Sequence, residues 1–160
     1  MRAVNRDDEI LRALRATFAG CRRPAYFTNY THCEECREHD DVLHAHDLDT
    51  LSHAHVGNPG WDPICFVSPA GFAYYFPALA RLALEPADDS YLPQLLFHLQ
   101  PDGRGNERWR HCTPEQRAAV VTFLRHVINT RPELLDNYAS TDDVLRALDA
   151  WSAAPQPSDT

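Results

Sequence analysis

The sequence contains no lysine, so all 15 of its fixed side-chain cations are arginine. The 23 aspartates and glutamates outnumber them and give a net charge of −8. Nucleic-acid-binding proteins neutralise phosphates with clustered cations, so this balance argues against a nucleic-acid partner. An acidic surface instead favours solubility or docking onto a basic protein. A lysine-free chain rich in arginine and alanine is also typical of a GC-rich bacterial genome.

Long apolar runs are missing as well. No stretch approaches the roughly 20 apolar residues that a membrane helix needs, and residues 1–8 contain no apolar segment that could serve as a secretory signal. We therefore expect no membrane partner and a cytoplasmic location. A length of 160 residues suits one domain with its own core. We predict a single helical domain over residues 1–152 and a flexible C-terminal tail over 153–160.

The common catalytic motifs are absent too. The sequence has no HExxH, no phosphate-binding glycine loop, no GxSxG and no dinucleotide fingerprint, so we assign no catalytic or cofactor-binding residue. The five cysteines are odd in number and no secretion signal accompanies them, which argues against a full set of disulfides. Cys21, Cys65 and Cys112 are predicted to be free thiols, with the role of small buried apolar residues.

Apolar residues recur at helical spacing through nearly the whole sequence. Capping side chains, proline at first helical positions and glycine stops mark the segment ends. We predict helices that start at Asp7 or Asp8, Cys33 or Glu34, Ser68, Asp89 or Ser90, Thr113, Pro132, and Ser140 or Thr141. The first should stop at Gly20 and the second at about His46. The pattern also allows a helical turn around 48–53 and predicts a polar loop over 101–112.

These segments amount to six or seven helices, with at most one short strand-like segment near 64–67. The predicted fold is therefore all-α. The helix over 70–84 is expected to lie at the centre, because its phenylalanines and tyrosines each bury about 150–250 Å². Pro77 falls inside this helix and should kink or interrupt it.

A dense group of metal-type donors lies at the start of the second predicted helix. Cys33 and Cys36 are one helical turn apart, and His39 is one further turn along the same face. A helix N-terminus favours the thiolate that metal binding requires, and zinc accepts sulfur together with imidazole nitrogen. The fourth ligand is not evident from spacing. We rank His32 and His98 ahead of the other donors, which are His44, Asp62 and Cys112.

Three interpretations of this group remain open. The first is a bound zinc with a structural role, the second is a free or redox-active thiol pair without metal, and the third is a set of ordinary surface residues. The neighbouring histidines His44, His46, His53 and His55 form either an exposed face with adventitious metal affinity or a catalytic metal site. Asp62 is either a ligand or base of such a site or the cap of a tight turn.

Part of the chain resembles a family of small uncharacterised bacterial proteins. The shared features are an HC-x2-C-x2-HD block, a GWDP turn and an aromatic-Pro-Ala-Leu helix, and they fall between residues 24 and 100. In this sequence the segments read FTNYTHC (27–33) with Cys36, Glu38, His39 and Asp40, then GNPGWDP (57–63) and FAYYFPAL (72–79). The resemblance implies that these pieces belong together, and it favours Cys33, Cys36 and His39 as a set. It implies no activity.

Composition and motifs together favour a non-enzymatic, zinc-stabilised helical protein that binds a basic protein partner, as an adaptor, a regulator or a toxin-neutralising immunity protein. The alternative is a metal-dependent hydrolase that uses the residues of the His- and Asp-rich region over 32–62. The sequence does not indicate an oligomeric state.

Overall fold

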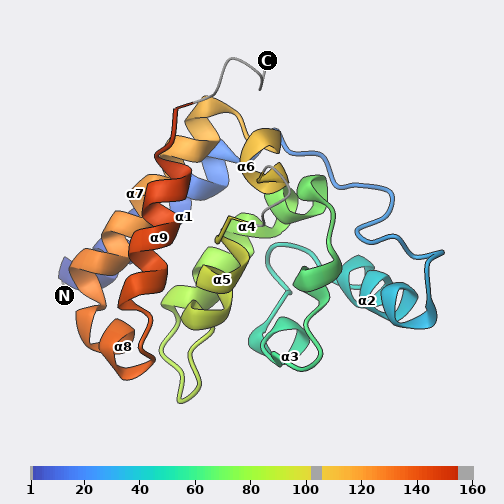
Figure 1. Ribbon diagram of the computed structural model, residues 1–160, viewed down its shortest axis with the longest axis horizontal. Helices are drawn as coiled ribbons and strands as arrows, with labels where there is room; N and C mark the ends of the chain where they lie inside the picture. Colours follow the sequence, from blue (N-terminus) through green and yellow to red (C-terminus); the bar gives the residue numbers. More distant parts are fainter. Residues whose placement is uncertain (1, 102–105, 155–160) are drawn as a thin grey trace.

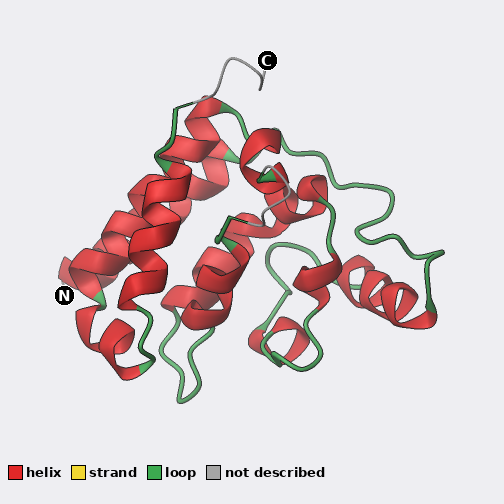
Figure 2. Cartoon of the chain, viewed as in Figure 1, coloured by secondary structure: helices red, strands yellow, loops and turns green. Residues whose placement is uncertain are grey.

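The predicted all-α class is confirmed. The computed structural model describes residues 2–101 and 106–154, and in these ranges the chain forms nine α-helices and one 3-10 helix without any sheet (Figures 1 and 2). The elements are α1 (Arg2–Thr17), α2 (Glu34–His44), α3 (His53–Val56), η1 (Pro63–Phe66), α4 (Pro69–Leu84), α5 (Leu92–His98), α6 (Glu107–His111), α7 (Pro114–Thr130), α8 (Pro132–Asn137) and α9 (Thr141–Trp151). None of the described helices has the length and apolar character required to cross a membrane.

Helix α4 is central, as its aromatic pattern predicts. Twelve of its 16 residues are buried, so nearly every face of the helix meets other elements. The Phe76 ring lies 5.3 Å from Phe18 of the α1 end and 6.0 Å from Phe123 of α7, measured between centroids. Pro77 does not interrupt the helix. Its ring leaves one backbone bond unmade, and the buried packing around it keeps the helix continuous.

The helices divide into two parts around α4 and α5. Helices α1, α7 and α9 run side by side on one flank, where α7 packs against both of the others, while α2 and α3 lie on the opposite flank (Figure 1). The caps predicted for two long helices are present: Ser68 Oγ accepts from Gly71 N, and Thr113 and Gln116 form a capping box.

Polar side chains fasten the second flank to α4. Tyr75 Oη donates to the carbonyl oxygens of Leu43 at 2.5 Å and His46 at 2.7 Å. Asp40 Oδ1 accepts from the backbone N–H groups of Phe27 and Thr28, at 2.7 and 3.0 Å. These bonds fix the irregular segment that precedes α2.

Several predicted boundaries are wrong. Helix α1 begins before the expected caps, and Asp7 pairs with Arg131 and His126 instead of capping a helix. Helix α2 ends at His44. In the ranges that it describes, the structure contains two helices in addition to the seven whose starts were predicted. These are α3 and α6, each a single turn or little more. Helix α6 occupies part of the predicted polar loop, of which residues 102–105 lie outside the described residues.

The strand-like segment near 64–67 is mostly a 3-10 helix. Pro63 stands at its first position and Asp62 Oδ1 accepts from Ile64 N at 2.9 Å, which favours a tight turn over extended backbone. Only Val67 is extended, and it pairs with Thr28 in an isolated bridge. Of the predicted tail, residues 155–160 lie outside the described residues, and Ala153 and Ala154 follow α9 without regular structure.

Candidate functional site

His32, Cys33 and Cys36 form the first group of metal-type donors, which we call the α2 donor group. Cys33 is the N-cap of α2, and its sulfur accepts from Cys36 N at 3.4 Å. The two sulfurs are 3.3 Å apart, and Cys36 Sγ lies 3.7 Å from His32 Nδ1. One donor atom from each residue therefore lies within 4.8 Å of the others.

The two thiols of this group have different environments. Cys33 is exposed and Cys36 is buried. The hydrogen bond from the Cys36 backbone N–H, helped by the Cys36 thiol, lowers the pKa of Cys33 below its usual value. The hydrogen bond between the two thiols, together with the smaller effect of burial, raises the pKa of Cys36. Cys33 is thus the thiol that ionises more readily and is open to solvent.

The structure places His39 outside this group. Its ring is fully buried between Trp61, at 4.6 Å, and Phe66, at 4.8 Å between centroids. Its Nε2 lies 3.4 Å from Glu35 Oε1, while its Nδ1 has no hydrogen-bond partner among the described residues. Helical spacing predicts that residues 33, 36 and 39 converge, but Cys33 is an extended cap and the two aromatic rings hold His39 toward η1.

Asp62, Cys65 and His98 form a second group, which we call the η1–α5 donor group. Asp62 Oδ2 lies 2.6 Å from His98 Nε2 and accepts from Gln94 Nε2 at 2.7 Å. The Asp62 and His98 side chains are both 2% exposed. Asp62 and His98 are predicted from the sequence as candidate fourth ligands for Cys33 and Cys36, whereas the structure brings them together with a different cysteine, Cys65. The capping role foreseen for Asp62 is confirmed.

Cys65 is the member of this group that sequence reasoning missed. The residue is exposed, yet desolvation of its thiol, followed by the charge of Asp62, raises its pKa to about 11. The expected role of a small buried residue is therefore wrong for Cys65, although its state as a free thiol is confirmed. The available signal was the Asp62-x2-Cys65 spacing, which repeats the spacing of Cys33 and Cys36.

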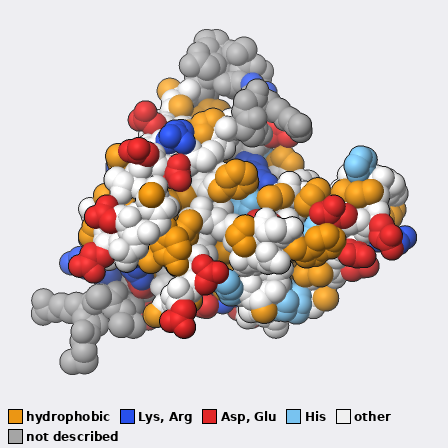
Figure 3. Space-filling model, turned by 60° about the horizontal axis from the view of Figure 1, so that its bottom comes forward, with side chains coloured by type: hydrophobic (Ala, Val, Ile, Leu, Met, Phe, Trp, Pro, Cys, Tyr) orange, Lys and Arg blue, Asp and Glu red, His pale blue; other side chains and the backbone are white. Residues whose placement is uncertain are grey.

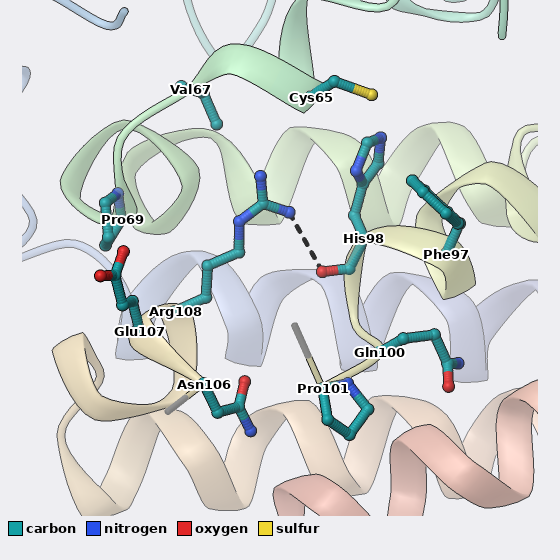
Figure 4. Close-up of a pocket in the computed structure, with 10 residues that line it drawn as sticks. All are labelled: Cys65, Val67, Pro69, Phe97, His98, Gln100, Pro101, Asn106, Glu107 and Arg108. Carbon is teal, nitrogen blue, oxygen red and sulfur yellow. Dashed lines mark hydrogen bonds between the residues drawn. The ribbon is translucent and has the colours of Figure 1, made fainter. Parts of the chain in front are cut away.

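The η1–α5 donor group borders two cavities. One, of about 500 Å³, is lined by Cys65, His98 and Arg108, among others. Figure 4 shows the His98 ring extending from the end of α5 toward the Cys65 sulfur. Arg108 donates to the carbonyl oxygens of Ile64 at 2.8 Å and His98 at 3.1 Å, so it ties α6 to both walls. The second cavity, of about 420 Å³, meets Asp62 and Cys65 from another side.

Two buried polar atoms near this group have no hydrogen-bond partner among the described residues. They are the Tyr91 hydroxyl oxygen and Gln100 Oε1. Tyr91 is fully buried, and desolvation together with the nearby Asp62 charge raises its pKa well above the usual value. Gln100 lines the larger cavity. Unpaired buried polar atoms are uncommon in native proteins, and an ion or water is a frequent reason for them.

The remaining predicted donors belong to neither group. His44 Nε2 lies 3.3 Å from Asp40 Oδ2, and the rings of His46 and His55 stack at 3.6 Å. The four histidines at 44, 46, 53 and 55 contribute to no set of three converging donors among the described residues. Cys112 is buried, and burial raises its pKa to about 12.

Comparison with known proteins gives one result at the level of a family. No curated protein and no solved structure matches the chain. A family model, described as a family of unknown function (DUF6714), matches residues 6–154. The match extends beyond the segment over 24–100 that carries the resemblance noted above, and it does not test the individual motifs of that segment. Because the model covers nearly the whole sequence, the chain belongs to the DUF6714 family of unknown function.

Proposed function

We propose that this chain is a non-enzymatic, zinc-stabilised helical protein whose zinc binds the α2 donor group and whose neighbouring acidic face binds a basic protein partner. The convergence of two sulfurs and one imidazole nitrogen carries the proposal. Tetrahedral zinc with bonds of about 2.3 Å to sulfur and 2.05 Å to nitrogen separates two sulfurs by roughly 3.8 Å, and sulfur from nitrogen by roughly 3.6 Å. The separations of 3.3 Å and 3.7 Å lie within about 0.5 Å of that geometry.

The zinc would act locally. All three donors come from residues 32–36, so an ion among them closes only a short loop and removes little chain entropy. The preceding segment is already held by Asp40, and by Thr28 Oγ1, which donates to Cys36 O at 2.7 Å. We therefore expect zinc to order the start of α2 and to leave one coordination position for water or for a partner residue.

The acidic face of α2 supports a basic partner. Glu34, Glu38 and Asp41 are exposed on this helix, which lies at the edge of the molecule, on a lobe where acidic side chains gather (Figure 3). Charge complementarity speeds encounter and selects partners more than it adds affinity. A partner held in this way should dissociate as ionic strength rises.

Elemental analysis of protein purified without a histidine tag tests the metal. We expect the Cys33→Ser, Cys36→Ser double variant to contain one equivalent of zinc less than the wild type. Cys21→Ser is the matched control, since Cys21 belongs to neither donor group and should leave the zinc content unchanged. Zinc that is absent from the wild type, with the two thiols recovered as a disulfide, would favour the thiol-pair interpretation.

The partner is tested by capture from an extract of the organism that encodes the chain. A variant with Glu34→Gln, Glu38→Gln and Asp41→Asn should lose a salt-sensitive partner whose own sequence is basic. A control with Glu133→Gln and Asp149→Asn, which neutralises exposed acids on α8 and α9, should retain it. Retention of the same partner by both variants would contradict binding through the acidic face of α2.

A metal-dependent hydrolase is the second candidate, and the position of Asp62 favours it. Among the acidic residues and histidines over 32–62, the buried Asp62 joins a donor group that borders cavities large enough for a small molecule. Turnover of generic phosphoester or amide substrates that a chelator abolishes would support this candidate. A chelator that alters local order at α2 without any such turnover would support the non-enzymatic proposal.

A further inference from the structure

We propose that Asp62, Cys65 and His98 form a second metal site, for a divalent transition-metal ion such as zinc, with its open coordination position toward the adjoining cavity. This site is independent of the α2 donor group, because it shares no residue with it and is built from different elements. It therefore stands or falls separately from the zinc-stabilised function proposed above, whereas the hydrolase candidate uses the same residues.

The 3-10 geometry of η1 brings two of the donors together. Asp62 is the N-cap of η1 and Cys65 lies three residues further on, and the turn is closed by a hydrogen bond from Cys65 N to Asp62 O at 3.2 Å, which keeps the two side chains close. His98, the last residue of α5, approaches the same point from across the fold. Donor atoms of the three residues lie within 4.8 Å of one another, and carboxylate, thiolate and imidazole are all zinc ligands.

Neighbouring groups orient these donors. Asp62 Oδ1 is held by Ile64 N at 2.9 Å, and Oδ2 by Gln94 Nε2 at 2.7 Å. Gln94 Nε2 also donates to Val56 O at 2.7 Å, so the amide that orients the carboxylate is itself fixed to the backbone. Metal sites depend on such outer contacts to set ligand direction.

Entry of an ion would exchange a hydrogen bond for coordination. Zinc bonds of about 2.1 Å to oxygen and nitrogen separate the two atoms by roughly 3.4 Å in a tetrahedral site, whereas Asp62 Oδ2 and His98 Nε2 are 2.6 Å apart. The pair must therefore open by about 0.8 Å while the ion replaces the proton between them. Binding should release protons and weaken in acid, since the Cys65 thiol must also ionise.

A purely structural role for the Asp62–His98 pair leaves two observations unexplained. A pair that only fastens η1 to α5 does not require a thiol at the same point, and Cys65 supplies one. Nor does it account for the fully buried Tyr91 hydroxyl, which lies within electrostatic reach of Asp62 and Cys65 and has no partner among the described residues.

The number of protein ligands defines the kind of site. A closed zinc site takes four protein donors, whereas each donor group of this chain supplies three, so each leaves one exchangeable position for water, a small molecule or a partner residue. Here the cavity of about 500 Å³ next to Cys65 and His98 gives that position access to solvent. We infer that water occupies it in the resting protein.

Cobalt titration in the Cys33→Ser, Cys36→Ser background tests this site without interference from the α2 donor group. Cobalt(II) replaces zinc and reports a thiolate ligand through a sulfur-to-metal charge-transfer band. We expect one equivalent of cobalt with such a band, and loss of the band on adding Cys65→Ser. Cys21→Ser in the same background is the matched control and should keep the band. Gln94→Ala should weaken binding by about 10–100-fold.

Two results would overturn the proposal. One is the absence of the charge-transfer band in the background protein. The other is metal binding that survives both Cys65→Ser and His98→Gln, which would identify adventitious binding to surface histidines. Circular dichroism of each variant checks its folding. If His98→Gln fails to fold, Cys65→Ser still decides the outcome, because Cys65 is exposed and its replacement removes one ligand atom with little change in volume.

Discussion

The two flanks of this molecule are held together in different ways. The flank of α1, α7 and α9 packs against α4 through apolar side chains such as Leu14, Phe18 and Phe123, all of them buried. The flank over residues 21–68, which we call the polar flank, also buries apolar side chains such as Phe27 and Leu43 in the core. Its irregular segments are held in addition by polar side chains that bond backbone groups. Arg23, for example, donates to the carbonyl oxygens of His44 at 2.8 Å and His46 at 2.9 Å.

The difference explains where the chemistry lies. A helix places side chains at fixed spacings, so donors on one helix converge only in a few patterns. Irregular backbone fixed by polar bonds can bring a cap, a 3-10 turn and a helix end to one point, and loops on a rigid scaffold are where functional residues concentrate. Both donor groups use the polar flank: the α2 group lies wholly within it, and the η1–α5 group joins it to α5.

Truncation of the apolar core should have the largest effect. Phe76→Ala removes a fully buried ring at the centre of the bundle and should lower the free energy of unfolding by about 3–5 kcal/mol. Urea denaturation measures this loss. Phe97→Ala is the matched control, because Phe97 is 67% exposed and its removal should change stability by no more than about 0.5 kcal/mol.

Loss of the Asp40 carboxylate should come next and should affect mainly the polar flank. Asp40→Ala leaves the buried N–H groups of Phe27 and Thr28 without their acceptor, at a cost of about 2–3 kcal/mol. Hydrogen exchange should show faster exchange over 25–45, with α7 and α9 little changed. Asp41→Ala, at the adjacent exposed position, should have almost no effect. Equal loss of protection on both flanks would show that Asp40 does not stabilise the polar flank in particular.

Tyr75→Phe should have a smaller effect at the junction of the two flanks. The change keeps the ring in the core and removes the hydroxyl that donates to Leu43 O and His46 O. We expect a loss of about 1–2 kcal/mol, with local exchange increased over 43–47. A variant as stable as the wild type would show that these carbonyl oxygens find other donors.

The smallest effect should be a pH-dependent one at Asp7. Its hydrogen bonds to Arg131, and then to His126, lower the pKa of Asp7 below 3.8, against the opposing effect of burial. Because the pKa of Asp7 is lower in the folded state than in the unfolded state, its carboxylate stabilises the fold at pH values above the unfolded-state pKa. This contribution disappears as the pH falls through the folded-state pKa. Asp7→Asn should therefore cost about 1 kcal/mol at pH 7, and the difference from wild type should disappear as the pH falls below 3.8 and through the folded-state pKa of Asp7.

Thermal or urea denaturation at several pH values measures this dependence. Asp8→Asn is the control at the neighbouring position and should follow the wild-type profile. A constant deficit of Asp7→Asn from pH 7 down to pH 2 would show that the loss is one of packing and not of charge.

The long helices of both flanks could be predicted from the sequence, whereas the long-range polar bonds of the polar flank could not. The cap at Ser68 and the capping box at Thr113 and Gln116 mark helix starts through local contacts, so they are legible in the sequence. The bonds of Asp40, Tyr75 and Arg23 join residues that are 12 to 51 positions apart, and no spacing rule indicates them. Helix α6 could not be predicted for another reason: its five residues are too few to show a helical pattern of apolar residues.

The two donor groups also differ in how far they could be predicted from the sequence. Spacing and chemistry identify Cys33 and Cys36, and the short reach from His32 to Cys36 is local. The packing that removes His39 from the group depends on Trp61 and Phe66, more than 20 residues away. The Asp62, Cys65 and His98 group requires both the 3-10 turn of η1 and the position of His98 at the end of α5, 36 residues from Asp62, so it becomes visible only in the fold.

Diffraction data collected on either side of the zinc absorption edge, from crystals of untagged protein, show directly whether zinc binds the α2 donor group. We expect an anomalous peak bonded to His32 Nδ1, Cys33 Sγ and Cys36 Sγ at the start of α2. A map without that peak, with the two sulfurs joined to each other or separated by solvent, would contradict it.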